Sequence, residues 1–377
     1  YNANCNVICM YSHDERMENN MIKNVNFINH KDQPLYAVCS NLREKDIAVK
    51  KPEVFDNDYD GHSILSLADI IAMVFPNGDV TKKPMLYIRH TDMIKNQYRF
   101  GDIVELGDHY LDVQKGVYHE QEIAQAGTKI SEYHAFDDGM YGFESTKPFS
   151  ELKFNEEYWT AKEGSVFSIK GEGWPKTIFE HQSMYNHVAT MIRAATVSGT
   201  FEGIPVFGLG EHDRLFIPTE IKGFDGITNN FGYVYMNMMG IREDGRREQA
   251  LISLEFSGKI FAYYYIDGEE PIISDHVSME AEWEQLPYVD DGTCVFKDAV
   301  FKFCGKEFHF EGKWGSKGFT PKPRLEKHGQ SQIFGTWYEG TTPYRHRVFL
   351  TFGENMEAYD YKLKDLGFDV KNKQEEQ

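Results

Sequence analysis

The chain has 377 residues, of which 41% are hydrophobic and 14% aromatic, so it can bury a sizeable core and is not disordered as a whole. This length is sufficient for one large or two medium domains. A formal net charge of −19 disfavours a broad surface for nucleic acid or anionic membranes, and no apolar run approaches the roughly 18 residues needed to span a bilayer.

The five cysteines are an odd and sparse set, which does not predict a disulfide framework. Cys5 and Cys9 are four residues apart, but no second Cys/His pair at zinc-finger spacing follows them, so no zinc site is predicted. The chain also has no Asn-x-Ser/Thr glycosylation acceptor. Together these features favour a cytoplasmic protein. Because the chain begins at Tyr1, a leader or an initial segment could precede it.

The first 80 residues are predicted to form an irregular, partly helical segment packed on the first lobe. Two helices are predicted, over residues 17–27 and 63–74, and a short strand over residues 35–39. In the second helix Ile64, Leu67 and Ile71 recur at three- and four-residue spacing, which is typical of one helix face.

An aspartate-rich run, Asp56, Asp58 and Asp60 followed by Gly61, resembles the front of a calcium-binding loop. An EF-hand loop that begins at Asp56 would carry Glu at its twelfth position, where this sequence has Leu67. A turn before the helix is therefore the main interpretation, and Ca²⁺ binding is the alternative.

From residue 80 onward, short apolar runs bounded by Gly, Asp or Pro predict strands. One long strand is expected over residues 231–241, with Tyr233, Tyr235, Asn237 and Met239 on one face. The other expected strands cover residues 85–89, 103–106, 110–113, 140–143, 249–256, 260–266, 294–304, 306–311, 334–339 and 345–352.

Many antiparallel strands at regular intervals predict a mainly β protein, with two consecutive calycin-like barrels or sandwiches and a small helical N-terminal element. We place the first β lobe at residues 81–190, the second barrel at 191–370 and a disordered tail at 371–377. The sequence has no Walker A loop, dinucleotide fingerprint, nucleophile elbow or His-Glu-x-x-His motif, so no organic cofactor is predicted.

The segment from Val197 to Arg214 predicts strand, tight turn and strand, and it ends in the polar run Glu211, His212, Asp213 and Arg214. Such a cluster is costly to bury unless its members pair with each other or with a ligand. Alternation along a strand places Glu211 and Asp213 on one face and His212 and Arg214 on the other. We predict that His212, Glu211 and Asp213 are catalytic and that Arg214 contacts the ligand; a structural ion cluster is the alternative.

Two further sets of side chains are candidates. His181 lies in a polar connection with His187, so His181 is a second candidate acid or base and His187 a ligand contact; a plain surface loop is the alternative. Aromatic side chains could line an internal pocket or fill the core. The aromatic ligand contacts that we predict are Tyr233, Tyr235, Tyr264 and Trp283.

The run Val197-Ser-Gly-Thr-Phe-Glu-Gly-Ile-Pro-Val-Phe-Gly-Leu-Gly resembles a strand–turn–strand element of double-calycin, lipocalin-like proteins. That group includes carotenoid hydratases, kievitone-hydratase-like proteins and Diels–Alderases. The resemblance implies two consecutive barrels and a hydrophobic ligand. The Asp-His-x-Trp-Gly signature of the hydratase branch is missing from the sequence, so the resemblance implies fold and ligand class rather than hydration.

We therefore predict a protein that binds a hydrophobic small molecule, such as a terpenoid, polyketide or lipid, in a β-barrel pocket. It would isomerise, hydrate or cyclise that molecule by acid/base catalysis, as a lyase or isomerase. One alternative is a carrier that performs no chemistry. Another is a carbohydrate-active sandwich, in which exposed Trp159, Trp314 and Trp337 stack on sugar rings. The sequence does not indicate an oligomeric state.

Overall fold

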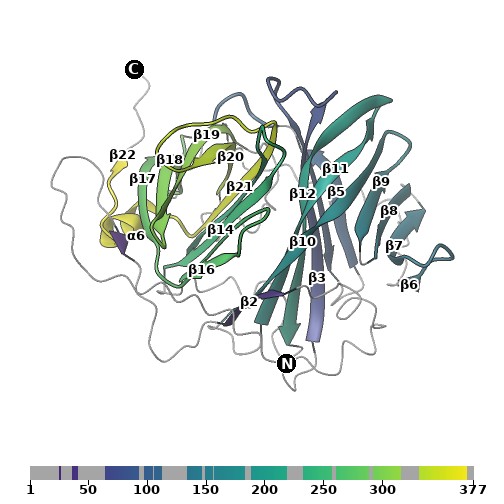
Figure 1. The fold of residues 1–377 in the computed structure, drawn as a ribbon, viewed down its shortest axis with the longest axis horizontal. Helices are drawn as coiled ribbons and strands as arrows, with labels where there is room; N and C mark the ends of the chain where they lie inside the picture. The colour runs from purple at the N-terminus through teal and green to yellow at the C-terminus, as the bar shows by residue number, and fades with distance from the viewer. Residues whose placement is uncertain are drawn as a thin grey trace.

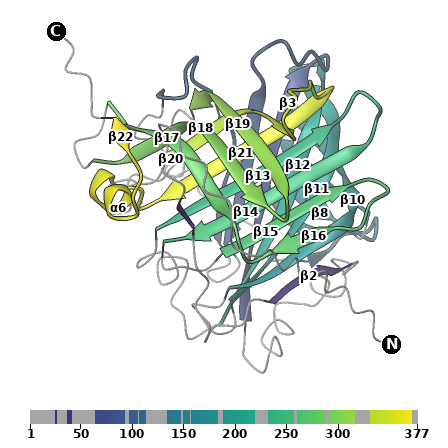
Figure 2. The same ribbon diagram turned by 60° about the vertical axis from the view of Figure 1, so that its left-hand side comes forward.

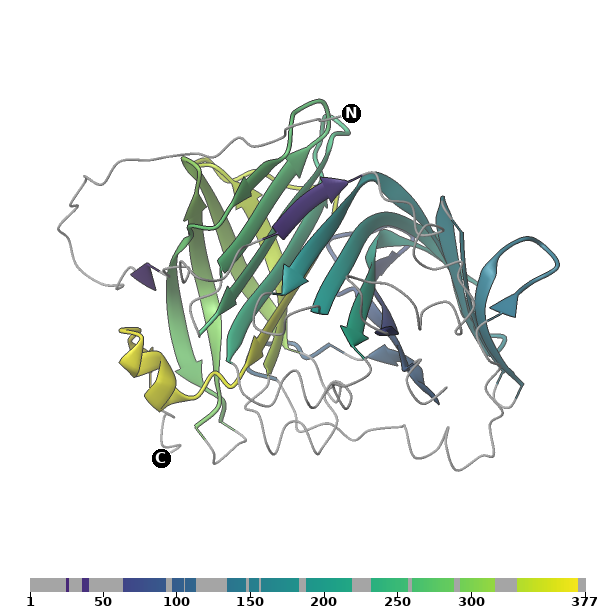
Figure 3. The ribbon, with the colours of Figure 1, turned by 90° about the horizontal axis from the view of Figure 1, so that it is seen from below.

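The chain folds into two mainly antiparallel sheets of 11 strands each, which lie side by side (Figure 1). Viewed from below, both sheets are curved: the second curls strongly on itself, and the first forms an open arch (Figure 3). The computed structural model describes residues 25–26, 36–40, 64–92, 97–104, 106–112, 134–146, 149–155, 157–182, 188–218, 232–256, 260–287, 292–315 and 331–371.

The first sheet, which we call the first unit, has the strand order β5-β4-β3-β12-β11-β10-β9-β8-β7-β6, and β2 pairs with β10. Its strands are β2 (Tyr36–Ser40), β3 (Ile64–Pro76), β4 (Met85–Asp92), β5 (Gln97–Val104), β6 (His134–Ala135), β7 (Tyr141–Thr146), β8 (Phe149–Phe154), β9 (Tyr158–Glu163), β10 (Phe167–Gln182), β11 (Val188–Phe201) and β12 (Ile204–Pro218).

The second sheet, the second unit, has the order β1-β17-β18-β19-β20-β21-β13-β14-β15-β16, and β22 pairs with β17. Its strands are β1 (Val25–Asn26), β13 (Tyr233–Ile241), β14 (Arg247–Glu255), β15 (Ile260–Ile266), β16 (Ile272–Ser274), β17 (Ser278–Gln285), β18 (Cys294–Phe303), β19 (Lys306–Gly315), β20 (Ser331–Glu339), β21 (Val348–Met356) and β22 (Val370–Lys371). The helix α6 (Asp360–Asp365) follows β21.

In both units the first long strand pairs with the last long strand. In the first unit the long strand β3 pairs with the next strand, β4, and also with the last strand, β12. In the second unit β13 pairs with β14 and with the last long strand, β21. This repeated meander confirms the prediction of a mainly β chain with two consecutive calycin-like units.

The helix predicted over residues 63–74 is wrong, because this segment is strand β3. β3 lies between β12 and β4, and every residue from Ile70 to Phe75 is buried. A strand that is covered on both faces carries a continuous apolar run, and a run of that kind contains helical spacings by chance. The helix predicted over residues 17–27 lies outside the described residues, except for Val25 and Asn26, which form β1.

The described strands also place the junction between the units. β11 and β12 belong to the first sheet, and the second sheet begins its main meander at Tyr233. The junction therefore falls between Pro218 and Tyr233, whereas the sequence analysis placed it at residue 190. A strand was predicted over residues 110–113. Tyr110 and Leu111 form a turn instead, and Val113 lies outside the described residues.

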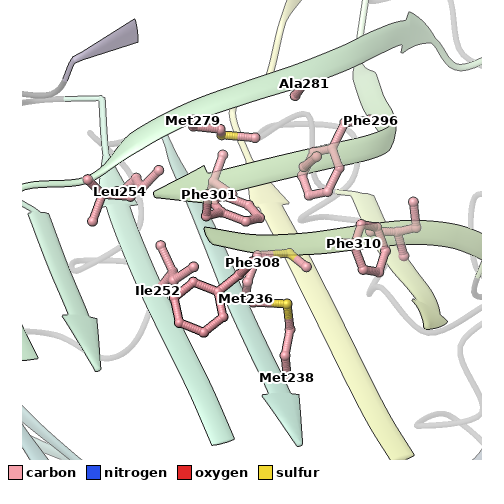
Figure 4. Packing of buried hydrophobic residues seen from close by; sticks show 14 of the residues in the cluster. Met236, Met238, Ile252, Leu254, Met279, Ala281, Phe296, Phe301, Phe308 and Phe310 are labelled. Atoms are coloured by element: carbon pink, nitrogen blue, oxygen red, sulfur yellow. The ribbon is translucent and has the colours of Figure 1, made fainter. Parts of the chain in front are cut away.

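The core of the second unit lies inside its curled sheet. Alternate residues of β13 and β14 point inward, where they meet phenylalanines of β18 and β19 (Figure 4). All of these side chains are at most 3% exposed, among them Met236, Met238, Ile252, Leu254, Phe296, Phe301, Phe308 and Phe310.

The opposite faces of β13, β14 and β21 pack against the first unit. Figure 2 shows these strands beside β11 and β12, and β12 contacts β21 directly. Two apolar clusters span the junction: one joins Met73 and Leu209 to Phe352, and the other joins Ile192 to Leu251. The two units therefore share a buried interface. In the described residues no helix is both long and apolar enough to cross a membrane.

Candidate functional site

The hairpin predicted around residue 202 is present and positions the polar run. β11 and β12 pair from Ala189 with Phe216 to Phe201 with Ile204. The two turn residues between them, Glu202 and Gly203, have φ angles of 49° and 79°. A two-residue turn with positive φ matches the twist of antiparallel strands, so the ladder continues through Glu211 to Arg214 without a register shift.

Strand alternation separates the predicted catalytic residues. Glu211 and His212 are each 1% exposed, and they lie on opposite faces of β12. Glu211 points with Leu209 toward the second unit, and Asp213 has the same parity. One substrate molecule therefore cannot contact Glu211 and His212 together.

A chain of buried amides holds the Glu211 carboxylate from the second unit. The side-chain nitrogen of Asn237 on β13 donates a hydrogen bond to Glu211 Oε2. Gln249 on β14 donates through Nε2 to Asn237 Oδ1 over 2.9 Å. Asn237 and Gln249 are 0% and 2% exposed. Because Asn237 Oδ1 accepts from Gln249, its amide nitrogen has to face Glu211, which fixes the orientation of the carboxylate.

More polar groups follow on the same face of the second unit. Tyr233 and Tyr235 share the Asn237 face of β13, as predicted, and Tyr235 lies against Phe352 with ring centroids 6.1 Å apart. Tyr233 donates through its hydroxyl to Glu354 Oε1 over 2.7 Å. Gln332 is paired with Glu354 across β20 and β21 and is fully buried. We call Glu211, Asn237, Gln249, Tyr233, Tyr235, Glu354 and Gln332 the inter-unit polar row.

Gln332 differs from the other members of the row. Neither its side-chain oxygen nor its side-chain nitrogen has a hydrogen-bond partner among the described residues. A buried primary amide without partners costs free energy, on the order of 1–3 kcal/mol. Such a group is suited to a ligand that supplies both a donor and an acceptor.

His212 lies on the inner face of the first unit. Its ring centroid is 5.2 Å from that of Phe154, and across the ladder it is paired with Arg193. His212, Arg193 and Trp159 are among the residues that line a small cavity of about 10 Å³, which is the size of about one water molecule. His212 and Arg193 are thus two adjacent polar side chains on the otherwise apolar inner face of the first unit.

The remaining predicted residues either lie elsewhere in the fold or fall outside the described part of the structure. Trp283 is fully buried in the core of the second unit, against Phe296 and Phe368. The backbones of His181 and Arg214 lie in β10 and β12, but their side chains are outside the described part of the structure. His187 and the calcium candidates Asp56, Asp58 and Asp60 also lie outside the described residues.

Tyr264, predicted as a ligand contact, belongs to a buried cluster inside the second unit. Its hydroxyl donates to Glu248 Oε2 over 3.2 Å. Three other groups converge on Glu248 Oε1: His346 Nε2 at 2.6 Å, the Tyr344 hydroxyl at 2.5 Å and Arg242 Nε at 3.1 Å. We call these five residues the Glu248 cluster.

Packing supports the Glu248 cluster. The imidazole of His346 lies against Gly240, where an added Cβ would be 2.2 Å from His346 Cδ2. The ring centroid of Trp337 is 4.8 Å from that of His346, and the Trp337 indole donates to the Met239 carbonyl over 3.0 Å. The absence of a side chain at Gly240 therefore makes room for the ring that holds Glu248.

The surroundings of Glu248 favour its ionised form. Burial acts to raise the pKa of this carboxyl, but the hydrogen bond and charge of His346, the hydroxyl of Tyr344 and the charge of Arg242 outweigh burial and lower the pKa below 4.5. Burial and the negative charge of Glu248 raise the pKa of both Tyr264 and Tyr344. The two phenols therefore act as donors to the carboxylate.

This shift predicts a pH dependence of stability. A carboxyl whose pKa is lower in the folded state contributes stability above its unfolded pKa and loses it as the pH falls through the folded value. We expect the difference in unfolding free energy between the wild type and Glu248→Gln to shrink steadily below about pH 4.5. Urea unfolding from pH 7 to pH 3 measures it. Glu311→Gln, at an exposed site, serves as the control, and a difference that stays constant down to pH 3 would contradict the prediction.

Sequence reasoning did not single out Glu248, His346, Tyr344 or Arg242. Glu248 and His346 are 98 positions apart, and no short motif joins them. One feature of the sequence could have indicated it. Glu248 lies at the start of the apolar strand β14, on the same face as Ala250 and Ile252, which are buried in the core. A buried acid at that place requires donors from other strands.

The carbohydrate interpretation depended on exposed tryptophans, and this expectation is wrong for two of the three. Trp159 and Trp337 are 3% and 2% exposed and belong to the cores of the two units. Trp314 is partly buried and lies parallel to Phe349, with ring centroids 6.4 Å apart. Within the described residues, no group of three or more His, Cys, Asp or Glu side chains is arranged to hold a metal ion.

Comparison with solved structures matches most of the chain. CghA is 12% identical, with 89% of this chain and 98% of CghA covered at a TM-score of 0.39. Kievitone hydratase from Nectria haematococca is 9% identical, with 85% of this chain and 96% of the hydratase covered at a TM-score of 0.33. The two-unit fold itself is established by the strand pairing described above.

No protein-family model matches the chain, and a search of curated proteins found no match.

Proposed function

We propose that the protein binds a largely apolar small molecule between its two β units and that Glu211 transfers a proton to or from this molecule. The observation that carries the proposal is the buried Glu211 carboxylate, which faces the other unit and is held there by Asn237. Acid/base catalysis needs an ionisable group in a fixed position within reach of the reacting atom.

The orientation of Glu211 supports this role. The Gln249–Asn237 hydrogen bond leaves only a donor nitrogen for Glu211, and this nitrogen contacts Oε2. The amide chain therefore fixes the orientation of the carboxylate, which would transfer the proton. Because Asn237 and Gln249 come from the second unit, the relative position of the units controls the catalytic geometry.

The ligand class follows from the surroundings of the inter-unit polar row. The row lies between two apolar clusters that join the units, so most of a ligand's contacts there would be apolar. Tyr233, Tyr235 and the unpartnered amide of Gln332 would bind a polar group on that ligand. We therefore propose a hydrophobic molecule with one carbonyl, hydroxyl or amide group, and isomerisation, hydration or cyclisation as the reaction.

Native mass spectrometry of the purified protein, followed by denaturing extraction, tests the binding. The protein is expected to carry about one small apolar molecule per chain. Tyr235→Ala and Gln332→Ala are expected to reduce the bound fraction about tenfold, since each removes a polar contact to the ligand. Tyr361→Ala, at an exposed tyrosine on α6 of the second unit, is the matched control and should retain it.

The outcomes separate the alternatives. If the Tyr235 and Gln332 variants retain the molecule as well as the control does, binding between the units is refuted. If the extracted molecule is unchanged after long incubation with fresh protein, the carrier hypothesis replaces catalysis. Conversion of that molecule into a product supports the proposed proton transfer.

A further inference from the structure

The outer face of the first unit carries an open groove with a volume of about 480 Å³, which we call the outer groove. It extends over strands β8 to β11, beside the turn between β6 and β7. The apolar side chains of Leu152 and Ala161 point to the opposite, inner face of the same strands. Ligand pockets have volumes of about 300–1,000 Å³, so the outer groove is large enough for a small molecule.

Strand pairing arranges the polar side chains of the outer groove in two series that cross the sheet. In the first series Glu151 on β8 is paired with Lys162 on β9, and Lys162 is paired with Ser168 on β10. Directly paired residues of antiparallel strands point to the same face, with Cβ atoms about 4.5–5.5 Å apart. The three side chains are therefore neighbours on the floor of the groove.

The second series lies two residues further along the strands. Lys153 is paired with Thr160, Thr160 with Lys170, and Lys170 with Ser198 on β11. Ammonium and hydroxyl groups therefore alternate across four adjacent strands. All four side chains line the groove.

Carboxylates hold two of the ammonium groups in place. Lys153 Nζ lies 3.1 Å from Asp138 Oδ2 and 3.3 Å from Glu151 Oε2, and Lys162 Nζ lies 3.1 Å from Glu151 Oε1. Glu151 is only 7% exposed, because it lies between the two lysines. Both of its oxygens are thus paired with ammonium groups.

The third ammonium group is held from two sides. Lys170 Nζ lies 2.9 Å from Glu172 Oε1, and it also lies 4.3 Å from the centroid of the Tyr158 ring. An ammonium group over an aromatic face is attracted by the electrons of the ring. Because these contacts already restrain the lysine side chain, a ligand would lose less entropy in ordering it.

The balance of charge in the outer groove indicates the class of ligand. Each of the three lysines has a carboxylate within 3.3 Å, supplied by Asp138, Glu151 or Glu172. An anion would gain little from ammonium groups that are already paired, and the net charge of −19 on the whole chain would repel it. A neutral ligand is not repelled. Hydroxyl groups suit such a site because each of them both donates and accepts hydrogen bonds.

We propose that the outer groove binds a neutral polyhydroxylated molecule, namely a mono- or disaccharide. The ammonium groups of Lys162 and Lys170 and the hydroxyls of Thr160, Ser168 and Ser198 would bind its hydroxyl groups. Hydrogen bonds to charged groups are about twice as strong as those between neutral groups. Binding here needs neither a tryptophan that stacks on the sugar nor cleavage of a bond. The proposal goes beyond the proposed function, since the groove is separate from the inter-unit polar row.

Saturation-transfer NMR of the full-length protein with glucose, galactose, mannose, maltose, cellobiose and lactose tests the proposal. At least one of these sugars is expected to receive saturation from the protein, and titration then gives its Kd. Lys170→Met/Ser198→Ala is expected to weaken this binding at least about tenfold, because it removes a charged donor and the neighbouring hydroxyl. Thermal unfolding checks that the double variant is folded, and Ser168→Ala, at an exposed position, is a second variant that should weaken binding severalfold.

Lys302→Met is the matched control. The Lys302 side chain has the same exposure as that of Lys170, 43%, and it also pairs with a glutamate, at 3.2 Å, but it lies on β18 of the second unit. This control should bind the sugar like the wild type. Tyr235→Ala, in the inter-unit polar row, should also keep the sugar affinity, which separates this test from that of the proposed function.

Three results would overturn the proposal. The first is that none of the six sugars receives saturation from the wild type. The second is that the double variant and Lys302→Met bind the sugar equally well. The third is that inorganic phosphate at the same concentration displaces the sugar, which would assign the outer groove to an anion instead.

Discussion

Replacing Glu211 by Gln is expected to reduce turnover of the extracted ligand by about two to four orders of magnitude. Gln still accepts the hydrogen bond from Asn237 and has nearly the same volume, so the fold and the inter-unit contact persist. The amide cannot donate or accept a proton in the reaction, which removes the acid/base contribution. Steady-state kinetics should show a loss in kcat with KM nearly unchanged, because the ligand contacts remain.

The matched control for this experiment is His212→Gln. It changes the adjacent residue, which is equally buried but lies on the opposite face of β12. Turnover of this variant should stay within a few-fold of the wild type. The reverse result, with His212 essential and Glu211 dispensable, would move the reaction to the inner face of the first unit, where Arg193 and Trp159 lie.

Replacing Glu248 by Ala is expected to destabilise the protein by about 3–5 kcal/mol. The substitution leaves Arg242, His346, Tyr344 and Tyr264 without the carboxylate that accepts their hydrogen bonds inside the second unit. It also leaves a cavity where side-chain atoms are fully buried. Urea unfolding monitored by tryptophan fluorescence, to which Trp337 beside His346 contributes, measures the change.

Glu311→Ala provides the comparison for Glu248→Ala. The Glu311 side chain is on β19 of the same unit but is 64% exposed, and its ion pair with Lys313 is long, at 3.9 Å. Exposed pairs of this kind contribute little, so the midpoint of unfolding should not move measurably. If both variants unfold at the wild-type denaturant concentration, the Glu248 cluster does not stabilise the second unit.

Strand alternation made part of this structure predictable. Tyr233, Tyr235 and Asn237 share a face of β13 as expected, because each strand buries its two sides against different partners. The same rule placed Glu211 and His212 on opposite faces of β12. It failed for β3, where every residue from Ile70 to Phe75 is buried and no polar residue marks the period within this run.

The pairing of Glu211 with Asn237 could not be predicted, because it depends on how two separate sheets pack. Each residue has its regular place in its own ladder, and nothing in either strand identifies the other. The Glu248 cluster was missed for a related reason. It joins the β13–β14 hairpin, β15 and the segment just before β21, and only the curl of the sheet brings these segments together.

The pairing between the first and last long strands of each unit also bears on how a chain with two similar units could arise. Ile64 at the start of β3 pairs with Pro218 at the end of β12, and Tyr233 at the start of β13 pairs with Met356 at the end of β21. The main meander of each unit, β3 to β12 and β13 to β21, therefore begins and ends on adjacent strands, at nearly the same place. A gene segment encoding one such meander could be copied in tandem with its own ladders intact, whereas the short strands β1, β2 and β22 lie outside the meanders and pair with β17, β10 and β17.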